Sequence, residues 1–275
     1  MKEVNSFPTI SACLVVYHEE KIIKRCLDSI KDLVDEIIIV HDGECHDRTL
    51  EIAKKYTNKI FIRQHIGIAE PHRTFSYEQA VSDWILQIDA DEFIDKKDIG
   101  AIKELLIDKE INGYWFQWEM WNGKKSIRLP GLIKLFLFRK NRFTYQGLPQ
   151  TAVTVLGKTK KVDLLLHHQP LEENISWRTA NKKRKYWLQS HVKYFFSDQV
   201  EYYCLGINID SWLNYLNKVK KNPWLYILWY PLKNFLGQLK NGLWRSWVGF
   251  NIALQQYVYY LCLYWQIWKL NKKLK

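Results

Sequence analysis

Apolar runs of strand length alternate with helix-like segments through the first hundred residues. The runs lie at 9–17, 36–42, 59–63 and 84–88, and the segments between them carry apolar residues at helical spacing. Parallel neighbouring strands need a crossover connection, so strands that alternate with helices predict repeated βαβ units. The pattern therefore predicts an α/β fold with a mostly parallel sheet, which would bind its ligand beyond the carboxyl ends of the strands.

The fourth apolar run ends in three carboxylates within four positions, in the stretch WILQIDADEF at 84–93. Alternate residues of an extended chain point to the same side, so Asp89 and Asp91 are predicted to aim their oxygens together. Such a D-x-D pair suits Mg²⁺ or Mn²⁺, which can neutralise a diphosphate leaving group. The alternative is a turn or a helix cap, but the place of the pair at a strand end favours metal binding.

The charge of the chain is concentrated at one end. Residues 1–176 have a balance of −1, whereas residues 177–275 have a balance of +13 and hold 24 of the 41 aromatic residues. We therefore predict an almost neutral domain at 1–175, in which the pattern becomes strand-rich from about residue 111. A basic, aromatic-rich helical extension is predicted at 176–275.

The extension contains a segment, 246–268, that carries no charge. It is long enough to cross a bilayer, but Trp and Tyr dominate it, and these rings prefer the headgroup region. Flanking lysines would be attracted to anionic lipid. The pattern favours helices on the membrane surface, and hence a cytoplasmic protein that is peripheral on the inner face of the cell membrane. A span, or packing of the aromatic residues onto the catalytic domain, are the alternatives.

Other classes of protein fit the composition less well. Five scattered cysteines without a C-x-x-C pair argue against a disulfide framework and suit a reducing compartment, and the first residues contain no secretion signal. The net charge of +12 and the many rings suggest a nucleic-acid binder. However, the charge-free run has no Lys or Arg among its rings, so no nucleic-acid partner is expected. A nucleotidyltransferase would show a Gly-rich basic loop after the first strand.

A family resemblance rests on three blocks in the same order and spacing: LVVYHEEKIIKRCLDSIKDLVDEIIIVHDG, DRTLEIAKKY and AEPHRTFSYEQAVSDWILQIDADEF. They resemble the family 2 glycosyltransferases, which have the Rossmann-like GT-A fold, and within them the branch that acts on lipopolysaccharide cores. The resemblance implies a nucleotide-sugar donor (UDP- or another NDP-sugar), Mg²⁺ or Mn²⁺, and inverting transfer by in-line attack. The implied acceptor is a lipid-linked or glycan acceptor in cell-surface polysaccharide synthesis. The resemblance also implies that 1–175 is the catalytic domain, with a nucleotide-binding half (1–110) and an acceptor half (111–175).

The resemblance also implies residues that bind the donor. Glu20 and Asp42, at the ends of the first two strands, would line the nucleoside pocket. Arg73, in the AEPHR block, would lie near the base or the diphosphate, and Asp89 would also contact the donor. The alternatives are that Asp42 only shapes a turn with Gly43 and that Arg73 is a solvated helix residue.

The family resemblance also implies a metal site. Asp89 and Asp91 would bind the cation, and Asp91 and Glu92 are the expected catalytic carboxylates. His167 or His168 falls where relatives place a histidine near the metal, and His167 is taken as the expected ligand. The alternative for this pair is one core and one surface histidine, because only one of two neighbours in a strand points inward.

The chain departs from the family in its acceptor half. Relatives often have His-Glu where this chain has Pro149 and Gln150, and glutamine cannot accept a proton, so the general base is not identified. A non-catalytic nucleotide-sugar-binding protein therefore stays an alternative. His41 stands where relatives usually have an aspartate, which leaves the preferred nucleotide base open.

Overall fold

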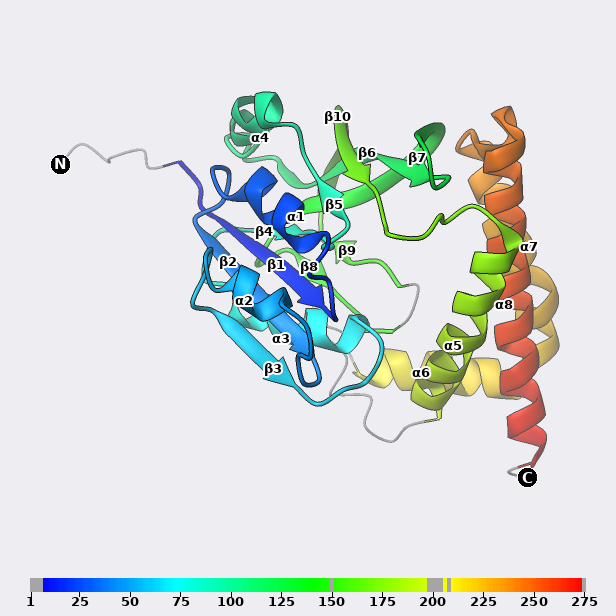
Figure 1. Ribbon diagram of the computed structural model, residues 1–275. Coiled ribbons are helices and arrows are strands. Elements are labelled where there is room, and N and C mark those ends of the chain that lie inside the picture. Colours follow the sequence, from blue (N-terminus) through cyan, green and yellow to red (C-terminus); the bar gives the residue numbers. More distant parts are fainter. Residues whose placement is uncertain (1–6, 149–150, 197–204, 207–208, 274–275) are drawn as a thin grey trace.

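An eight-stranded mixed sheet, in the order β3-β2-β1-β4-β7-β6-β10-β5, forms the centre of the N-terminal region (Figure 1). The computed structural model describes residues 7–148, 151–196, 205–206 and 209–273. The first four strands of the chain pair in parallel, as the alternating pattern predicted. They and their connecting helices are β1 (Ile10–Val16), α1 (Ile23–Ile30), β2 (Glu36–Asp42), α2 (Thr49–Ala53), β3 (Ile60–Arg63), α3 (Glu70–Gln79) and β4 (Trp84–Gln87).

The buried strands are apolar on both faces because helices cover both sides of this half of the sheet. Within β1, Ala12 and Leu14 belong to one hydrophobic core, whereas Cys13 between them belongs to the core on the other face. Ile38 on β2 and Ile85 on β4 join Cys13 there. Two-sided burial explains why these strands read as continuous apolar runs rather than as alternating patterns.

The second half of the sheet is mixed. β7 (Ser126–Arg139) is antiparallel to both β4 and β6 (Ile111–Trp121), and β10 (Lys158–His168) is parallel to β6. The short β5 (Glu92–Phe93) is antiparallel to β10 and places His168 opposite Glu92. This pairing brings the acidic cluster of the fourth strand against the end of β10. The remaining elements here are a 3₁₀ turn (Lys96–Asp98), α4 (Ile99–Leu105), β8 (Phe143–Thr144) and β9 (Thr154–Val155).

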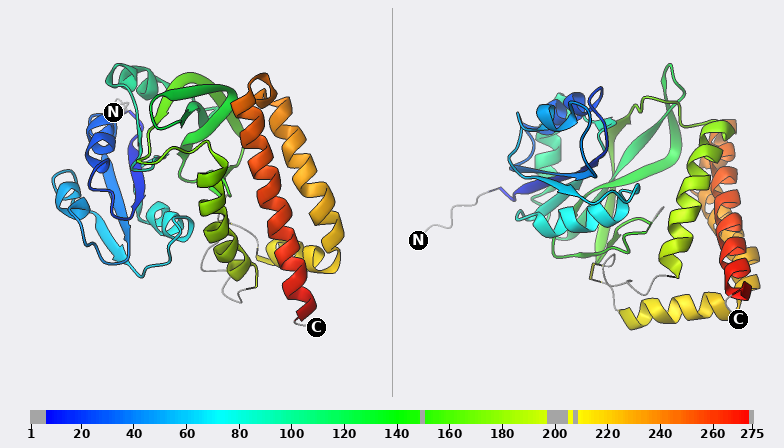
Figure 2. Two further views of the ribbon diagram at one scale, coloured as in Figure 1. Left: turned by 45° about the vertical axis from the view of Figure 1, so that its right-hand side comes forward. Right: turned by 60° about the horizontal axis from the view of Figure 1, so that its bottom comes forward.

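The part of the C-terminal extension that the structure describes contains four α-helices: α5 (Trp177–Phe195), α6 (Ile209–Lys221), α7 (Pro223–Lys240) and α8 (Trp247–Lys273). α8 lies between α5 and α7, and α7 is the outer member of this layer (Figure 2). The helices share a core of their own that includes Leu188, Trp212, Leu216, Tyr259 and Leu263. Among the described residues, no helix has both the length and the apolar character that crossing a bilayer requires.

The helical extension joins the sheet through close backbone contact. The turn between α7 and α8, which includes a 3₁₀ turn (Leu243–Arg245), packs on β7. Gly131 on β7 has a φ of +81°, and a Cβ at this position would lie 1.7 Å from the backbone oxygen of Asn241. Gly242 has a φ of +111° and lies against Pro130. Only glycine combines these angles with so little space, so both residues are required at the junction.

Candidate active site

A cleft of about 590 Å³ lies between the carboxyl end of the sheet and the helices α5 and α8. One wall carries four carboxylates, Glu19, Glu70, Asp89 and Asp91, together with Arg73. The wall formed by α5 contributes two cations to the cleft, Lys183 and Arg184. A negative wall that faces a positive one is suited to a ligand that combines a cation with phosphate groups.

Asp89 is held by two cations. Its carboxylate accepts hydrogen bonds from Arg73 (2.5 Å) and from the ammonium of Lys134 (2.8 Å). Burial opposes ionisation, but the charges of Arg73 and Lys134 hold the pKa of Asp89 well below its usual value. Asp89 is therefore ionised and already neutralised by protein groups, which leaves it less free to bind a metal than its neighbour Asp91.

Glu92 is fully buried and does not line the cleft. Its carboxylate accepts hydrogen bonds from Lys134 (2.6 Å), from the indole N–H of Trp118 (2.7 Å) and from the backbone N–H of Asp89 (2.9 Å). Such a group cannot reach an acceptor in the cleft. The prediction that Glu92 is catalytic is corrected: its side chain positions Lys134 and closes the turn that presents Asp89.

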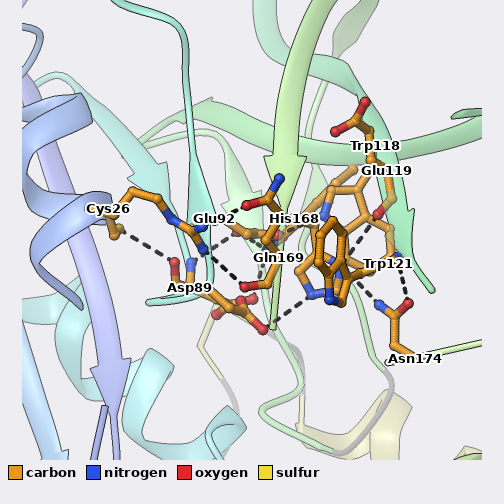
Figure 3. Close-up of polar contacts among 12 residues, drawn as sticks. Cys26, Asp89, Glu92, Trp118, Glu119, Trp121, His168, Gln169 and Asn174 are labelled. Atoms are coloured by element: carbon orange, nitrogen blue, oxygen red, sulfur yellow. Dashed lines mark hydrogen bonds and ion pairs between the residues drawn. The ribbon is translucent and has the colours of Figure 1, made fainter. Parts of the chain in front are cut away.

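Asp91 lies beside His168 on the cleft wall, with 3.2 Å between Oδ2 and Nε2. The imidazole stacks on Trp118, with ring centroids 4.4 Å apart (Figure 3). Burial lowers the pKa of His168, but the hydrogen bond and charge of Asp91 outweigh it, so the pKa is raised. The amide oxygen of Asn174 accepts the N–H of Trp121, so its amide nitrogen faces Nδ1 of His168 at 3.0 Å.

His167 points away from this cluster. Its Nδ1 lies 2.9 Å from a carboxylate oxygen of Glu119, and its ring stacks on Phe93. Successive residues of a strand face opposite sides, so β10 can direct only one of the two histidines at the cleft. The structure brings His168 to Asp91, and the expectation that His167 is the metal ligand is corrected accordingly.

Asp42 lies at the end of β2, as expected, but does not line the cleft. Its buried carboxylate accepts hydrogen bonds from the backbone N–H groups of Ile66 and Gly67 and from His72 (2.8 Å). Burial opposes ionisation, and these hydrogen bonds lower the pKa of Asp42 below its usual value. The geometry thus replaces the expected nucleoside contact with a positioning role, because Asp42 fixes the loop that leads into α3 and so places Arg73.

The carboxylate that follows β1 into the cleft is Glu19, not Glu20. Glu20 accepts the backbone N–H of Arg48 and does not line the cleft. The family resemblance had implied Glu20, so the predicted residue in the first sequence block is corrected by one position. Burial, followed by the charges of Asp91 and Asp89, raises the pKa of Glu19 to about 7.

Replacing Glu19 with glutamine is expected to change how stability depends on pH. Folded Glu19 keeps its proton up to about pH 7, whereas a glutamate in the unfolded chain has its usual pKa of 4.5, so stability falls as pH rises through this window. Glu19→Gln should therefore stabilise the protein by about 1–3 kcal/mol at pH 8 and change little at pH 5. Urea unfolding in the presence of a chelator measures this. Glu20→Gln is the matched control, and an equal shift in both variants contradicts the prediction.

The site predicted from the sequence did not include three basic residues, Lys134, Lys183 and Arg184. Lys134 is the single charged residue within the apolar run LIKLFLF on β7. A lone charge in an apolar strand was the sequence signal that could have identified it as a functional residue. Lys183 and Arg184 lie in the basic run NKKRK on α5, and such a run does not show what the helix packs against. Gln150 lies outside the described residues.

Comparison with known proteins defines the family. Residues 11–158, just over half of the chain, match the sequence model of Glycosyl transferase family 2. The chain belongs to glycosyltransferase family 2. Membership confirms the predicted GT-A fold and the predicted enzyme class, a glycosyltransferase.

Curated relatives of this family 2 glycosyltransferase match over part of their length. An uncharacterized glycosyltransferase of Rickettsia felis is 38% identical over 88 residues, which cover 32% of this chain and 30% of the relative. The SPbeta prophage-derived glycosyltransferase SunS of Bacillus subtilis is 36% identical over 109 residues, covering 38% and 25%. The match thus spans about a third or less of these relatives.

Solved structures of glucosyl-3-phosphoglycerate synthase from Mycobacterium tuberculosis also resemble the chain. One has a TM-score of 0.45 at 14% identity and covers 67% of this chain and 78% of its own. Another, in complex with Mg²⁺ and UDP, has a TM-score of 0.34 at 22% identity and covers 40% and 44%.

Proposed function

We propose that this family 2 glycosyltransferase transfers a sugar, with inversion, from a nucleoside-diphosphate donor to a hydroxyl of a membrane-linked glycan or lipid. The observation that carries this proposal is the cleft. Asp91 and His168 stand on its acidic wall, and Lys183 and Arg184 line it from α5. A divalent cation and a diphosphate together complement these two walls.

The residues present fit Mg²⁺ or Mn²⁺ as a two-ligand site. Within the described ranges, no group of three or more His, Cys, Asp or Glu side chains is arranged to hold a metal. Mg²⁺ commonly uses one or two carboxylates and completes its shell with water and substrate phosphates. Asp91 would hold the cation, and Nε2 of His168, 3.2 Å from its carboxylate, would be the second ligand when that nitrogen carries no proton. When bound, the cation would neutralise charge on the leaving diphosphate.

The transfer itself is a single displacement. The acceptor hydroxyl oxygen forms a bond to the anomeric carbon as the bond from that carbon to the diphosphate oxygen breaks. The nucleoside diphosphate leaves with the electron pair, and the hydroxyl proton passes to a base. Glu19 and Glu70 line the cleft and form no ion pair with any described residue, so we assign the base to this pair.

The proposed acceptor belongs to the cell surface. The three sequence blocks that resemble the lipopolysaccharide branch support an acceptor of that kind. The basic, aromatic extension supports a peripheral place on the inner face of the cell membrane, where lipid-linked acceptors lie. Because α5 and α8 line the cleft, the extension would also take part in binding the acceptor.

Calorimetric titration with a panel of nucleoside diphosphates, with and without Mn²⁺, tests the donor class. We expect binding that depends on Mn²⁺ and that selects one base. Hydrolysis of the matching nucleotide-sugar, or its transfer to extracted membrane glycolipids, then tests turnover. Binding without turnover would support the non-catalytic alternative, and the absence of any binding in the presence of Mn²⁺ would contradict the proposal.

Removing both Lys183 and Arg184 is expected to weaken diphosphate binding. Both side chains are half-buried at the cleft, and hydrogen bonds to charged groups contribute about 1.5–3 kcal/mol. Lys183→Ala/Arg184→Ala should therefore raise the Kd for the preferred nucleoside diphosphate by about 10- to 100-fold. The same titration measures this.

The matched control for this prediction is on the same helix. Lys182 and Lys185 are exposed and do not line the cleft, so Lys182→Ala/Lys185→Ala removes the same net charge from the opposite side of α5. Affinity should then change little. An equal loss in both double variants would mean that the net charge of the extension, rather than contact with the diphosphate, controls binding.

A further inference from the structure

The outer face of α7 is apolar and exposed. It consists of Trp224, Leu225, Leu228, Trp229, Leu232 and Leu236. The four leucines recur at intervals of three and four residues, which places them along one side of the helix. Leu228 is 66% exposed, whereas Ile227 and Pro231, on the other side of α7, are buried in the helical layer. An exposed apolar stripe of this length on a helix indicates an interaction surface.

Two more exposed tryptophans follow the helix. Trp244, in the turn between α7 and α8, and Trp247, the first residue of α8, are 62% and 78% exposed. Figure 2 shows α7 at the outer edge of the molecule, on the side of α8 that faces away from the sheet. α7 packs on α8 and α6, and at the start of the outer face the ring of Trp224 lies 5.2 Å from that of Trp268 on α8, while Leu225, Leu228 and Leu236 are more than half exposed. The described part of the chain therefore leaves the outer face of α7 open to a partner.

The charges around this face are of one sign. No aspartate or glutamate follows Asp210 in the sequence, whereas ten lysine and arginine residues do. Lys233 and Lys240 lie on α7 itself, and Lys221 and Arg245 flank its two ends. Two copies of this chain that paired through α7 would bring these cations together without a carboxylate to neutralise them. An anionic lipid surface has the complementary charge.

We infer that the outer face of α7 docks on an anionic lipid bilayer. The helix lies in the plane of the interface, with its leucines inserted among the acyl chains and its tryptophans at the headgroups. Lys233 and Lys240 contact lipid phosphates. The inference goes beyond the proposed transfer reaction, because docking requires neither donor nor acceptor and is measured without them.

Vesicle flotation with the full chain tests this docking. We expect wild-type protein to float with phosphatidylcholine vesicles that contain phosphatidylglycerol, and to float much less with phosphatidylcholine alone. Leu228→Glu/Leu232→Glu should lower the bound fraction by about tenfold or more on both kinds of vesicle. Lys233→Glu/Lys240→Glu should remove only the gain that the anionic lipid provides.

The matched control places the same charges on exposed apolar residues elsewhere. Ile62 and Val81 on the sheet region are 59% and 74% exposed, so Ile62→Glu/Val81→Glu should float like wild type. Circular dichroism and nucleotide binding show that each variant is folded. Protein that stays at the bottom with both kinds of vesicle overturns the inference. A dimer in light scattering that Leu228→Glu/Leu232→Glu dissociates also overturns it, because a second copy then covers the face.

Discussion

Replacing Asp91 with asparagine is expected to lower kcat by about 10³-fold, the cost of removing one preorganised charge from a transition state. Within the described residues, Asp91 forms no ion pair with a lysine or arginine, and its carboxylate lies 3.2 Å from His168. The substitution keeps the shape of the side chain and removes its charge. Binding of the nucleoside diphosphate should also lose its dependence on Mn²⁺, which calorimetry measures separately from turnover.

The control for Asp91 lies four residues further along the chain. Asp95 belongs to the same acidic run but lies outside the cleft and pairs with Lys97. Asp95→Asn should therefore retain turnover within a factor of about two, as a surface substitution does. Unchanged turnover in Asp91→Asn, with Mn²⁺-dependent binding intact, would contradict the assignment of the cation to Asp91 and His168.

Replacing Lys134 with methionine is expected to destabilise the protein by about 3–5 kcal/mol at pH 8, the range for breaking a buried ion pair. The ammonium contacts Glu92 at 2.6 Å and Asp89 at 2.8 Å. Methionine fills the space but leaves the carboxylate of Glu92 buried without a counter-charge. Burial already raises the pKa of Glu92, so protonation at pH 5 should recover part of the loss. Urea unfolding at both pH values measures this.

Two variants make the Lys134 result decisive. Glu92→Gln in the Lys134→Met background removes the orphaned charge, and should restore about half or more of the lost stability at pH 8. Lys158→Met breaks the ion pair with Glu110, in which both side chains are exposed, and should cost about 1 kcal/mol or less. If Lys134→Met is no more costly than Lys158→Met, Lys134 does not hold the buried carboxylates in place.

Local sequence patterns were sufficient to predict the parallel half of the sheet. Each of β1 to β4 is an apolar run bounded by a helix, and parallel pairing follows from the crossover connections. The mixed half of the sheet was less predictable, because the pattern of apolar and polar residues in a strand does not show which other strand it pairs with. β10 joins β6 in parallel across a separation of about 50 residues, and the two-residue β5 is too short to leave a pattern.

Site prediction failed mainly by single residues, for a related reason. The two-residue period of a strand shows that neighbours face opposite ways, but not which of them faces the cleft. The choice between His167 and His168 depended on the register of β10 against β5, and the choice between Glu19 and Glu20 on a turn after β1 in which His18 adopts a φ of 53°. Lys134 is 42 residues from Glu92 along the chain, and only the folded sheet brings them together.

The glycine contact between β7 and the turn after α7 limits how this enzyme can be rebuilt. At Gly131 the backbone of one region occupies the place of a side chain of the other, so the helical layer cannot be exchanged as an independent module. A chimaera that takes its last hundred residues from another transferase would need the matching hairpin of the recipient sheet as well. The helices that line the cleft and the strand that carries Lys134 are therefore tied together at this one junction.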